Sequence, residues 1–345
     1  MNTLDQILSS IQAMPLGLSL GQLLALYPEV PRRTMQRWLA DLVASGRIVA
    51  RGQARARVYL FRQTLVSPPN VAGSVTDVFP SFIPLSADSR DVLTYVNQAV
   101  AARKPVAYQR DFLDDYRANH TWYLSPSLRR QLWRMGKTSE ANAPAGTYSR
   151  AILNRLLIDL SWASSHLEGN TYSRLDTLAL IEHGTVAQGK AAIETQMILN
   201  HKNAIELLAD NSDVASFDRF TLMNLHSALA ENLLPNPEYE GRIRRHAVEI
   251  GQSVYRPLAD MNLLDEMFDL MLEKVNAIDD PFEQSFFMMV HLPYLQPFSD
   301  VNKRTSRLAA NLPLFRANLC PLTFLDVPES AYSRAMMGVY ELTRV

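Results

Sequence analysis

The segment Leu292–Leu319 holds the residues of this chain whose types and spacing are best suited to chemistry on phosphates. An apolar stretch stops at Gln296, a short polar turn follows, and the pattern predicts a second helix that begins near Asn302. A turn that leads into a helix N-terminus presents free backbone N–H groups and the positive end of the helix dipole, which favour phosphate. Arg304 and Arg307, three residues apart, add bidentate positive charge on one face of that helix.

Asp300 lies within this turn and supplies a carboxylate. A carboxylate beside a phosphate site is a hard oxygen ligand of the kind that Mg²⁺ prefers. Residue types and spacing alone leave two interpretations open. One is a phosphate site with a metal ion, and the other is an ordinary junction between two helices whose charges are solvated.

The same segment resembles the motif HPFxDGNGRxxR of the Fic family, whose members move AMP from ATP onto target hydroxyl groups. The matching residues are Pro297, Phe298, Asp300, Asn302, Arg304 and Arg307. A second stretch, Ser164–Asn170, is similar to the inhibitory helix motif of that family, S/T-x-x-x-E-G/N. A third stretch, Gly251–Tyr255, resembles the β-hairpin flap that holds the target chain in register. The resemblance extends over about residues 90–345.

The resemblance implies a role for each of these residues. Asp300 would hold Mg²⁺, Asn302 and Arg304 would bind phosphates of ATP, and Arg307 would bind the γ-phosphate. Glu168 would pair with Arg307 and occupy the guanidinium that the γ-phosphate needs, so the protein would inhibit itself. The residues expected in the inhibitory segment are Ser164, Glu168, Gly169 and Asn170, and those expected in the flap are Ser253, Val254 and Tyr255.

The sequence departs from the family pattern at the residue that matters most for catalysis. The family places a histidine, its general base, where this chain has Gln296, and a neutral amide has no basicity near pH 7. Ordinary AMP transfer is therefore expected to be weak or absent. The histidines His166, His246 and His291 are interpreted as structural or surface groups and not as replacement bases.

Two glycines of the motif are also replaced, by Val301 and Lys303. Glycine at these positions lets the backbone approach phosphate closely, and a side chain narrows the conformational choice of the turn. The Asn302-Lys303-Arg304 run resembles the Doc branch of the same fold, in which ATP is used for phosphate transfer. In such a role Lys303 would supply a point charge to a phosphate and belong to the nucleotide-binding residues.

The N-terminal part of the chain predicts three helices and a hairpin, the order of elements in winged-helix domains. Leu4–Ile11 has helical spacing, and Ser19 with Gln22 forms a capping-box pattern that opens a second helix. A third helix can begin at Pro31, where the missing N–H is not needed. Residues 47–62 alternate in the manner of a hairpin.

This part of the chain is strongly basic. Between Glu29 and Arg62 eight arginines stand against two acidic residues, a net charge of +6, so the rest of the chain carries −7. Such a window suits a polyanion, and we expect DNA contact. The third helix would be the recognition helix, and its candidate DNA-binding residues are Arg32, Arg33, Gln36 and Arg37. The alternative is a module for protein docking or dimerisation with a solvated basic face.

The resulting fold class is mostly α: an all-helical Fic fold with a short β-hairpin flap within Ala247–Tyr255, preceded by a winged-helix domain. The winged helix is expected in residues 1–63 and the Fic domain in residues 88–345, with the inhibitory helix near 161–170. Residues 64–87 are rich in Pro, Ser and Gly and form the expected linker.

Composition predicts a cytoplasmic protein of 345 residues that contacts no membrane. Its apolar share, 47% of residues, is sufficient for a large core, and no run is long enough to span a bilayer. No signal-peptide pattern is recognised at the N-terminus. The single cysteine, Cys320, excludes an intrachain disulfide and a cysteine-based metal site.

Three functional hypotheses follow. The first is a regulatory pseudoenzyme that binds ATP and Mg²⁺ through Asp300–Arg307 and adjusts DNA binding by the N-terminal module. The second is an active Fic enzyme that transfers AMP or phosphate to a protein hydroxyl and is autoinhibited by Glu168. The third is a fold that serves only for protein docking. A homodimer is a further expectation, because winged-helix proteins often bind DNA as dimers.

Overall fold

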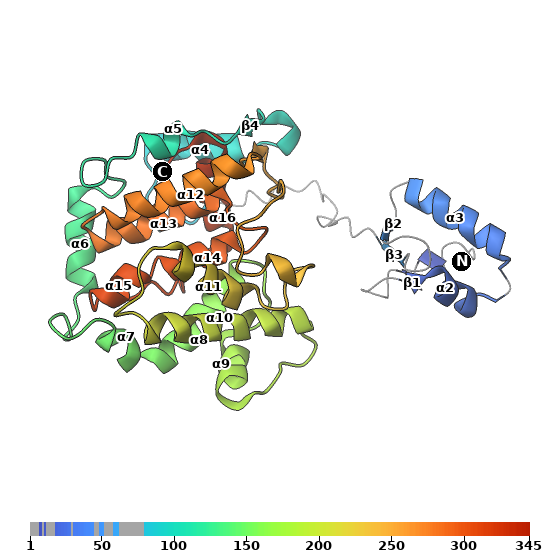
Figure 1. Cartoon of the computed structure of the whole chain (residues 1–345), viewed down its shortest axis with the longest axis horizontal. Coiled ribbons are helices and arrows are strands. Elements are labelled where there is room, and N and C mark those ends of the chain that lie inside the picture. The colour runs from blue at the N-terminus through green and yellow to red at the C-terminus, as the bar shows by residue number, and fades with distance from the viewer. Residues whose placement is uncertain are drawn as a thin grey trace. The chain divides into compact units, whose positions relative to one another are not determined.

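The chain divides into two compact units, Met1–Asp77 and Val78–Val345, which are described separately below. The computed structural model describes residues 7–8, 10–11, 18–28, 30–44, 48–51, 58–61 and 79–345. Most of the predicted linker, residues 64–78, lies outside the described residues. Figure 1 shows the elements of each unit in the colours of the chain order.

The first unit packs helices against a three-stranded antiparallel sheet. Its elements are β1 (Leu18–Ser19), α2 (Leu20–Leu26), α3 (Arg32–Ala44), β2 (Ile48–Arg51) and β3 (Val58–Phe61). The strand order is β1-β3-β2, so β3 is central. The unit has a hydrophobic core of its own, in which helix and sheet residues meet: Leu23, Met35, Leu39, Ile48 and Tyr59.

Local signals in the sequence account for these elements. The capping box predicted at the start of the second helix is present, because Gln22 N–H donates to Ser19 Oγ and Ser19 N–H donates to Gln22 Oε1. The third helix begins directly after Pro31, as expected. The predicted hairpin is formed by β2 and β3, which pair antiparallel through Ile48 and Phe61. Its turn, residues 52–57, lies outside the described residues.

The second unit is helical except for two short strands, β4 (Val106–Ala107) and β5 (Tyr255–Arg256). Its helices are α4 (Ala87–Val96), η2 (Val100–Ala102), α5 (Asp111–Asp114), α6 (Pro126–Gly136), α7 (Thr147–Ala151), α8 (Leu153–His166), α9 (Arg174–His183), α10 (Ala192–Asp210), α11 (Arg219–Ala230), η3 (Pro237–Tyr239), α12 (Met261–Asn276), α13 (Pro281–Leu295), α14 (Asn302–Ala309), α15 (Leu312–Arg316) and α16 (Glu329–Leu342).

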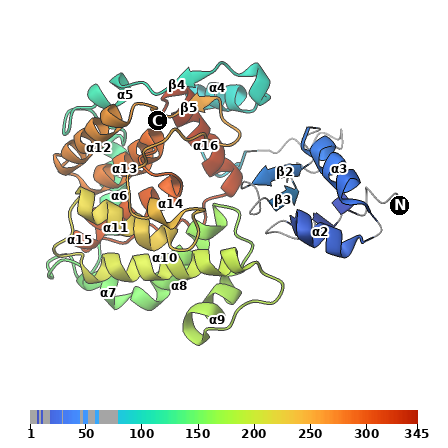
Figure 2. The same ribbon diagram turned by 45° about the vertical axis from the view of Figure 1, so that its right-hand side comes forward.

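Helices α13 and α14 form the centre of this unit. Nearly every residue of both helices is buried, which explains why α13 reads as apolar on all sides. Helix α13 packs against α12, α15 and α16, and α14 packs against α11 and α8. In Figures 1 and 2, α14 lies between α8 and α10 on one side and α13 and α16 on the other. The turn between α13 and α14 is therefore held from several directions.

The two strands pair differently from the hairpin expected within Ala247–Tyr255. Strand β5 pairs in parallel with β4, with Val106 opposite Tyr255 and Ala107 opposite Arg256. The residues before β5 follow an irregular path. Local alternation of β-branched residues indicated an extended segment, but the partner strand lies more than a hundred residues earlier in the chain. Within the part of the chain that the structure describes, no helix is long and apolar enough to cross a bilayer.

Candidate active site

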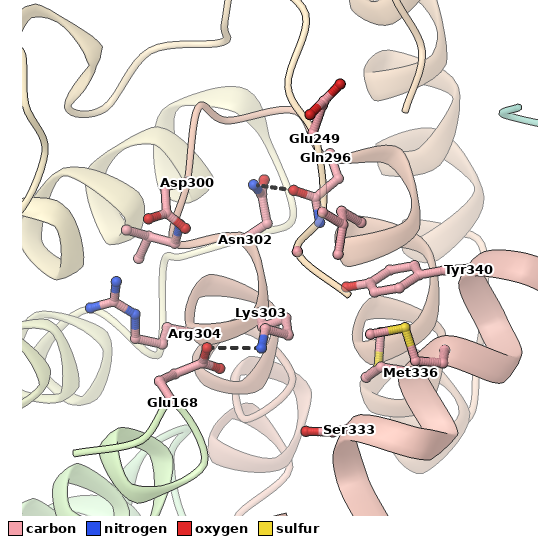
Figure 3. A pocket seen from close by; sticks show the side chains of 14 residues that line it. Glu168, Glu249, Gln296, Asp300, Asn302, Lys303, Arg304, Ser333, Met336 and Tyr340 are labelled. Carbon is pink, nitrogen blue, oxygen red and sulfur yellow. Dashed lines mark hydrogen bonds and ion pairs between the residues drawn. The ribbon is translucent and has the colours of Figure 1, made fainter. Parts of the chain in front are cut away.

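A cavity of about 250 Å³ lies where the α13–α14 turn, the residue segment after α8, the loop before β5 and helix α16 meet. Figure 3 shows the charged groups of Asp300 and Arg304 on one side and Met336 and Tyr340 on the opposite side. The lining residues that the sequence predicted are Glu168, Gln296, Asp300, Asn302, Lys303 and Arg304. Residues of the second, third and last quarters of the chain thus converge on one polar cavity with an apolar wall.

Gln296 ends helix α13 and faces the cavity in a fixed orientation. Its backbone is left-handed, with φ 52° and ψ 57°, and its side chain is buried. Gln296 Nε2 donates to the carbonyl of Pro293 at 2.7 Å, and Gln296 Oε1 accepts from Asn302 Nδ2 at 2.8 Å. Asn302 Oδ1 in turn accepts from the Phe298 N–H at 3.0 Å. A carbonyl only accepts and an N–H only donates, so these backbone groups decide the orientation of both amides.

The orientation of the Gln296 amide has a chemical consequence. Gln296 presents a neutral amide to the cavity, and an amide cannot take up a proton near neutral pH. None of His166, His246 and His291 lines the cavity. His291 is buried among aromatic rings and contacts the hydroxyl of Tyr123 at 2.6 Å, and burial lowers its pKa to about 3. The described residues around the cavity therefore offer no histidine that could act as the base.

The turn itself is kept in shape by His226, a residue that no sequence pattern indicated. Its ring stacks on Phe298 with centroids 3.9 Å apart. Its Nδ1 accepts the N–H of Gly241 at 2.9 Å, so we place the proton on Nε2, which contacts the Asp300 carbonyl at 3.2 Å. Burial lowers the pKa of His226 to about 4, so the ring is neutral at pH 7. His226 thus connects α11 to the turn without adding charge.

Arg244 is the second residue that sequence analysis did not identify. Its side chain is almost fully buried and donates to three backbone carbonyls: Gln296 at 2.7 Å, His246 at 2.8 Å and Leu258 at 2.6 Å. Burial lowers the pKa of Arg244 to about 10, which leaves it charged at neutral pH. Its contacts lie up to 52 residues away in sequence, so no local pattern could have revealed them. Arg244 ties the end of α13 to the loop before β5.

The loop before β5 contributes different residues from those predicted for the flap. Ser253 and Val254 turn away from the cavity, because Ser253 Oγ and the Val254 N–H donate to Glu341 Oε1 at 2.8 and 3.2 Å. Glu341 also forms a buried ion pair with Arg103 at 2.7 Å. Tyr255 is buried in β5. The loop residues that line the cavity are Glu249, Ile250 and Gly251.

Arg307 lies behind the cavity and has no solvent contact. Its Nη2 donates to Glu168 Oε1 at 2.8 Å and to the Ser164 carbonyl at 3.0 Å, and its Nε donates to Ser164 Oγ at 3.0 Å. Ser164 Oγ also contacts His201 Nε2 at 2.9 Å. Burial and the charge of Arg304 lower the pKa of His201 to about 3, so its ring is neutral and can accept from the serine hydroxyl. The ion pair expected between Glu168 and Arg307 is present.

Gly169 and Asn170 shape the end of α8 that carries Glu168. Gly169 has φ +82°, a left-handed conformation that glycine adopts without strain. Asn170 is buried, and its Nδ2 donates to the Glu194 carbonyl of α10 at 2.8 Å. These two residues of the predicted inhibitory segment therefore hold the backbone of the turn, while Ser164 and Glu168 make the contacts to Arg307.

Glu168 accepts from two cations. Its Oε1 pairs with Arg307 at 2.8 Å and its Oε2 with Lys303 at 2.9 Å. Burial acts to raise the pKa of Glu168, but the attraction of Arg307 and Lys303 is stronger in sum and lowers it. Glu168 is therefore ionised at neutral pH.

Arg304 is the cation with the fewest partners in the cavity. It is 7% exposed, its Nη1 has no hydrogen-bond partner among the described residues, and it forms no ion pair there within 4.0 Å. Arg307 Nη1 and the Tyr340 hydroxyl also lack a hydrogen-bond partner among the described residues. A buried guanidinium N–H without an acceptor is unfavourable by about 1 to 3 kcal/mol or more, so an anion entering the cavity would be stabilised there.

A metal ion would find one exposed carboxylate on the turn, that of Asp300. The Asp300 Oδ1 accepts the Val301 N–H at 2.6 Å, which leaves Oδ2 for a ligand. No group of three or more His, Cys, Asp or Glu side chains suited to a metal occurs in the described ranges. This donor set fits Mg²⁺ that takes its remaining oxygen ligands from phosphates and water, and it does not fit a cage made of protein side chains.

Comparison with known proteins places this geometry in a family. Residues 216–314 match the model of the Fic/DOC family. They are therefore a Fic/DOC family domain, and they include α11, the turn that carries Gln296 to Val301, and all of α14. Glu168, helix α16 and the first unit lie outside the matched residues.

Two similar proteins are named as protein adenylyltransferases. Protein adenylyltransferase fic-1 of Caenorhabditis elegans is 30% identical over 182 residues, which are 51% of this chain and 35% of that protein. Protein adenylyltransferase Fic of Culex quinquefasciatus is 31% identical over 169 residues, 45% of this chain and 31% of that protein. The chain thus matches about a third of the length of these curated relatives.

Two solved structures are also similar. Fic-1 from C. elegans has a TM-score of 0.47 at 20% identity and covers 74% of this chain and 65% of its own. A Fic domain containing signaling protein from Bacteroides thetaiotaomicron has a TM-score of 0.47 at 16% identity and covers 60% of this chain and 80% of its own.

The backbone of Val301 yields a first prediction. Val301 has φ 64°, where a β-branched residue is strained by about 1 to 2 kcal/mol, yet its side chain is buried in the core. We expect Val301→Gly to be at least as stable toward urea as Val301→Ala, because both lose buried methyl groups and only glycine relieves the strain. At Val290, buried within α13, the free energy of unfolding should be about 1 kcal/mol higher for the alanine variant than for the glycine variant. Equal rankings at both positions would contradict the expectation.

A second prediction concerns pH. Because the folded-state pKa of Glu168 is lowered, its ionisation stabilises the fold above the unfolded-state pKa of about 4.3, and this stabilisation is lost as pH falls through the lower folded-state pKa. Glu168→Gln should therefore lower the free energy of unfolding at pH 7, by about 3 to 5 kcal/mol if the buried arginine stays unpaired. The difference from the parent protein, measured by urea titration, should shrink below about pH 4. A difference independent of pH would exclude the ion pair as its cause.

Proposed function

We propose that this chain binds ATP with Mg²⁺ at the α13–α14 turn and acts as a regulator whose capacity for AMP transfer is impaired at Gln296. The observation that carries the proposal is the buried Arg304, whose Nη1 lacks an acceptor beside the N-terminus of α14. A phosphate in the cavity would accept from Arg304 and from the free N–H groups of that helix end. The names of the similar proteins, protein adenylyltransferases, support ATP as the nucleotide.

The two walls of the cavity suggest how the nucleotide would lie. Phosphates would face Asn302, Lys303 and Arg304, and Asp300 would hold Mg²⁺ against them. Mg²⁺ supplies positive charge that neutralises phosphate oxygens. The apolar wall, with Ile250 and Met336, would contact the adenine ring of the nucleotide.

The amide of Gln296 decides which reaction is accessible. In AMP transfer a target hydroxyl oxygen attacks the α-phosphorus, the bond to the β-phosphate oxygen breaks, and pyrophosphate leaves. The hydroxyl proton must pass to a base, which is commonly worth about 10² to 10⁴-fold in rate. Gln296 cannot accept that proton, although it can still position a group by hydrogen bonding. The proposal therefore assigns nucleotide binding to the site and little transfer.

The second candidate is an active enzyme that transfers AMP or phosphate from ATP to a protein hydroxyl and is inhibited by Glu168. The contact that favours it is the ion pair between Glu168 and Arg307. An ion pair that competes with phosphate binding would limit turnover, and such a limit matters only for an active enzyme. In this candidate a substrate group or water takes the proton.

Restoring the base distinguishes the two candidates. We expect Glu168→Gly combined with Gln296→His to label protein with α-³²P-ATP about 10² to 10⁴-fold faster than Glu168→Gly alone, because the imidazole supplies the missing base. Adding Arg304→Ala should abolish the label. Parallel reactions with γ-³²P-ATP detect phosphate transfer. Labelling by Glu168→Gly alone at the rate of the histidine variant would favour the active enzyme and contradict the impaired one.

For the first unit we propose a winged-helix module that binds DNA. Its DNA binding would be the activity that nucleotide binding regulates. The side chains of Arg32, Arg33, Gln36 and Arg37 are all exposed on α3, while Met35 and Leu39 face the core. A helix with this division can place its basic face in a major groove. Arg55 and Arg57, which lie between β2 and β3 in the chain, are outside the described residues.

The salt dependence of duplex binding tests this module. Each phosphate contact changes the slope of log Kobs against log salt by about 0.9, so Arg33→Ala with Arg37→Ala should flatten the slope by about two. Arg130→Ala with Arg134→Ala, exposed on α6 of the other unit, serves as the matched control and should leave the slope unchanged. Binding that does not depend on salt, or equal effects of both pairs, would favour a protein-docking or dimerisation module.

A further inference from the structure

Lys303 stands where the Fic motif has a glycine, and its ammonium group makes a second contact to Glu168. The Lys303 Nζ lies 2.9 Å from Glu168 Oε2, as the dashed line in Figure 3 marks. The other carboxylate oxygen, Oε1, is taken by Arg307. Lys303 and Arg307 are four residues apart on α14, a spacing that brings both side chains to the same face. One carboxylate is therefore the shared counter-ion of two cations of the candidate phosphate site.

The two cations are held very differently. Arg307 has a fully buried side chain and two further contacts to Ser164, so it keeps its place without Glu168. The Lys303 side chain is 34% exposed, lines the cavity, and has Glu168 as its one ion-pair partner among the described residues. A lysine is a flexible point charge that can change partners. Lys303 is thus the cation that can exchange a carboxylate for another anion at the same cavity.

We propose that Lys303 is a masked phosphate ligand: Glu168 neutralises it in the resting protein, and an incoming nucleoside polyphosphate takes it over as Glu168 leaves. This inference rests on the proposed binding of ATP and specifies its regulation. Glu168 and the phosphates compete for the same two cations, so the nucleotide must break two ion pairs instead of one. The affinity for ATP is therefore set by the balance between gaining Lys303 as a ligand and releasing it from Glu168.

This balance predicts that the effect of Lys303 depends on Glu168. When Glu168 is absent, loss of the lysine removes only a phosphate ligand and weakens binding. When Glu168 is present, the same loss also loosens the carboxylate that competes with the nucleotide, so the two effects offset each other. A lysine with a purely structural role would change binding equally in both backgrounds.

The test is a double-mutant cycle with MgATP as the probe, measured by calorimetry on the full chain. The four proteins are the parent, Lys303→Met, Glu168→Gln and the double variant. In the Glu168→Gln background we expect Lys303→Met to weaken binding about tenfold, the size of one charged hydrogen bond, and Lys303→Arg to restore it. In the parent background the change should stay below about threefold, because the two effects offset. Lys202→Met, which removes a similar 2.9 Å pair with Glu206 on α10, should leave the affinity for MgATP unchanged in both backgrounds.

Three results would overturn the inference. An equal loss in both backgrounds means that Lys303 binds phosphate without being masked, and no loss in the Glu168→Gln background means that it binds none. Both leave the proposed binding of ATP standing. Absence of MgATP binding in all four proteins removes the proposed function together with the inference that rests on it.

Discussion

A guanidinium group without solvent contact must find its counter-charge inside the protein, and for Arg307 that counter-charge is Glu168. The requirement links α14 to α8, because the side chains that accept hydrogen bonds from Arg307 belong to Ser164, in the last turn of α8, and Glu168, just after it. It also places a carboxylate at the edge of the cavity, beside the positive charges of Lys303 and Arg304. The same pair therefore contributes to the fold and brings a carboxylate among the cations of the cavity.

The amide network of the turn holds the site together without a titratable group at Gln296. Gln296 and Asn302 bond to each other and to the backbone of the turn, so both the amide oxygen and the amide nitrogen of Gln296 have partners. Such an arrangement keeps the geometry around the helix N-terminus independent of proton transfer. Binding and turnover are then separate properties of one site, which is why we assign the first to this chain and test the second by substitution.

Much of the architecture could be predicted from the sequence, and the exceptions have a common physical origin. The capping box at Ser19, the start of α3 after Pro31 and the clustering of Asp300, Asn302 and Arg304 all depend on neighbours within a few residues. His226 and Arg244 do not: each contacts the turn across more than fifty residues, and neither belongs to a motif. The expected hairpin was an incorrect pairing for the same reason, since β-propensity indicates an extended strand but does not choose its partner.

The loop over the cavity is tied at both ends, by Arg244 near its beginning and by Glu341 near its end. Only residues 247–252 lie between these anchors, and six residues span at most about 20 Å when fully extended. The loop is therefore a short segment with both ends held in place, so its middle can move only over a short range. Whatever passes beneath it must be slender, and a single extended peptide or one ribose with its base meets that condition better than a folded surface does.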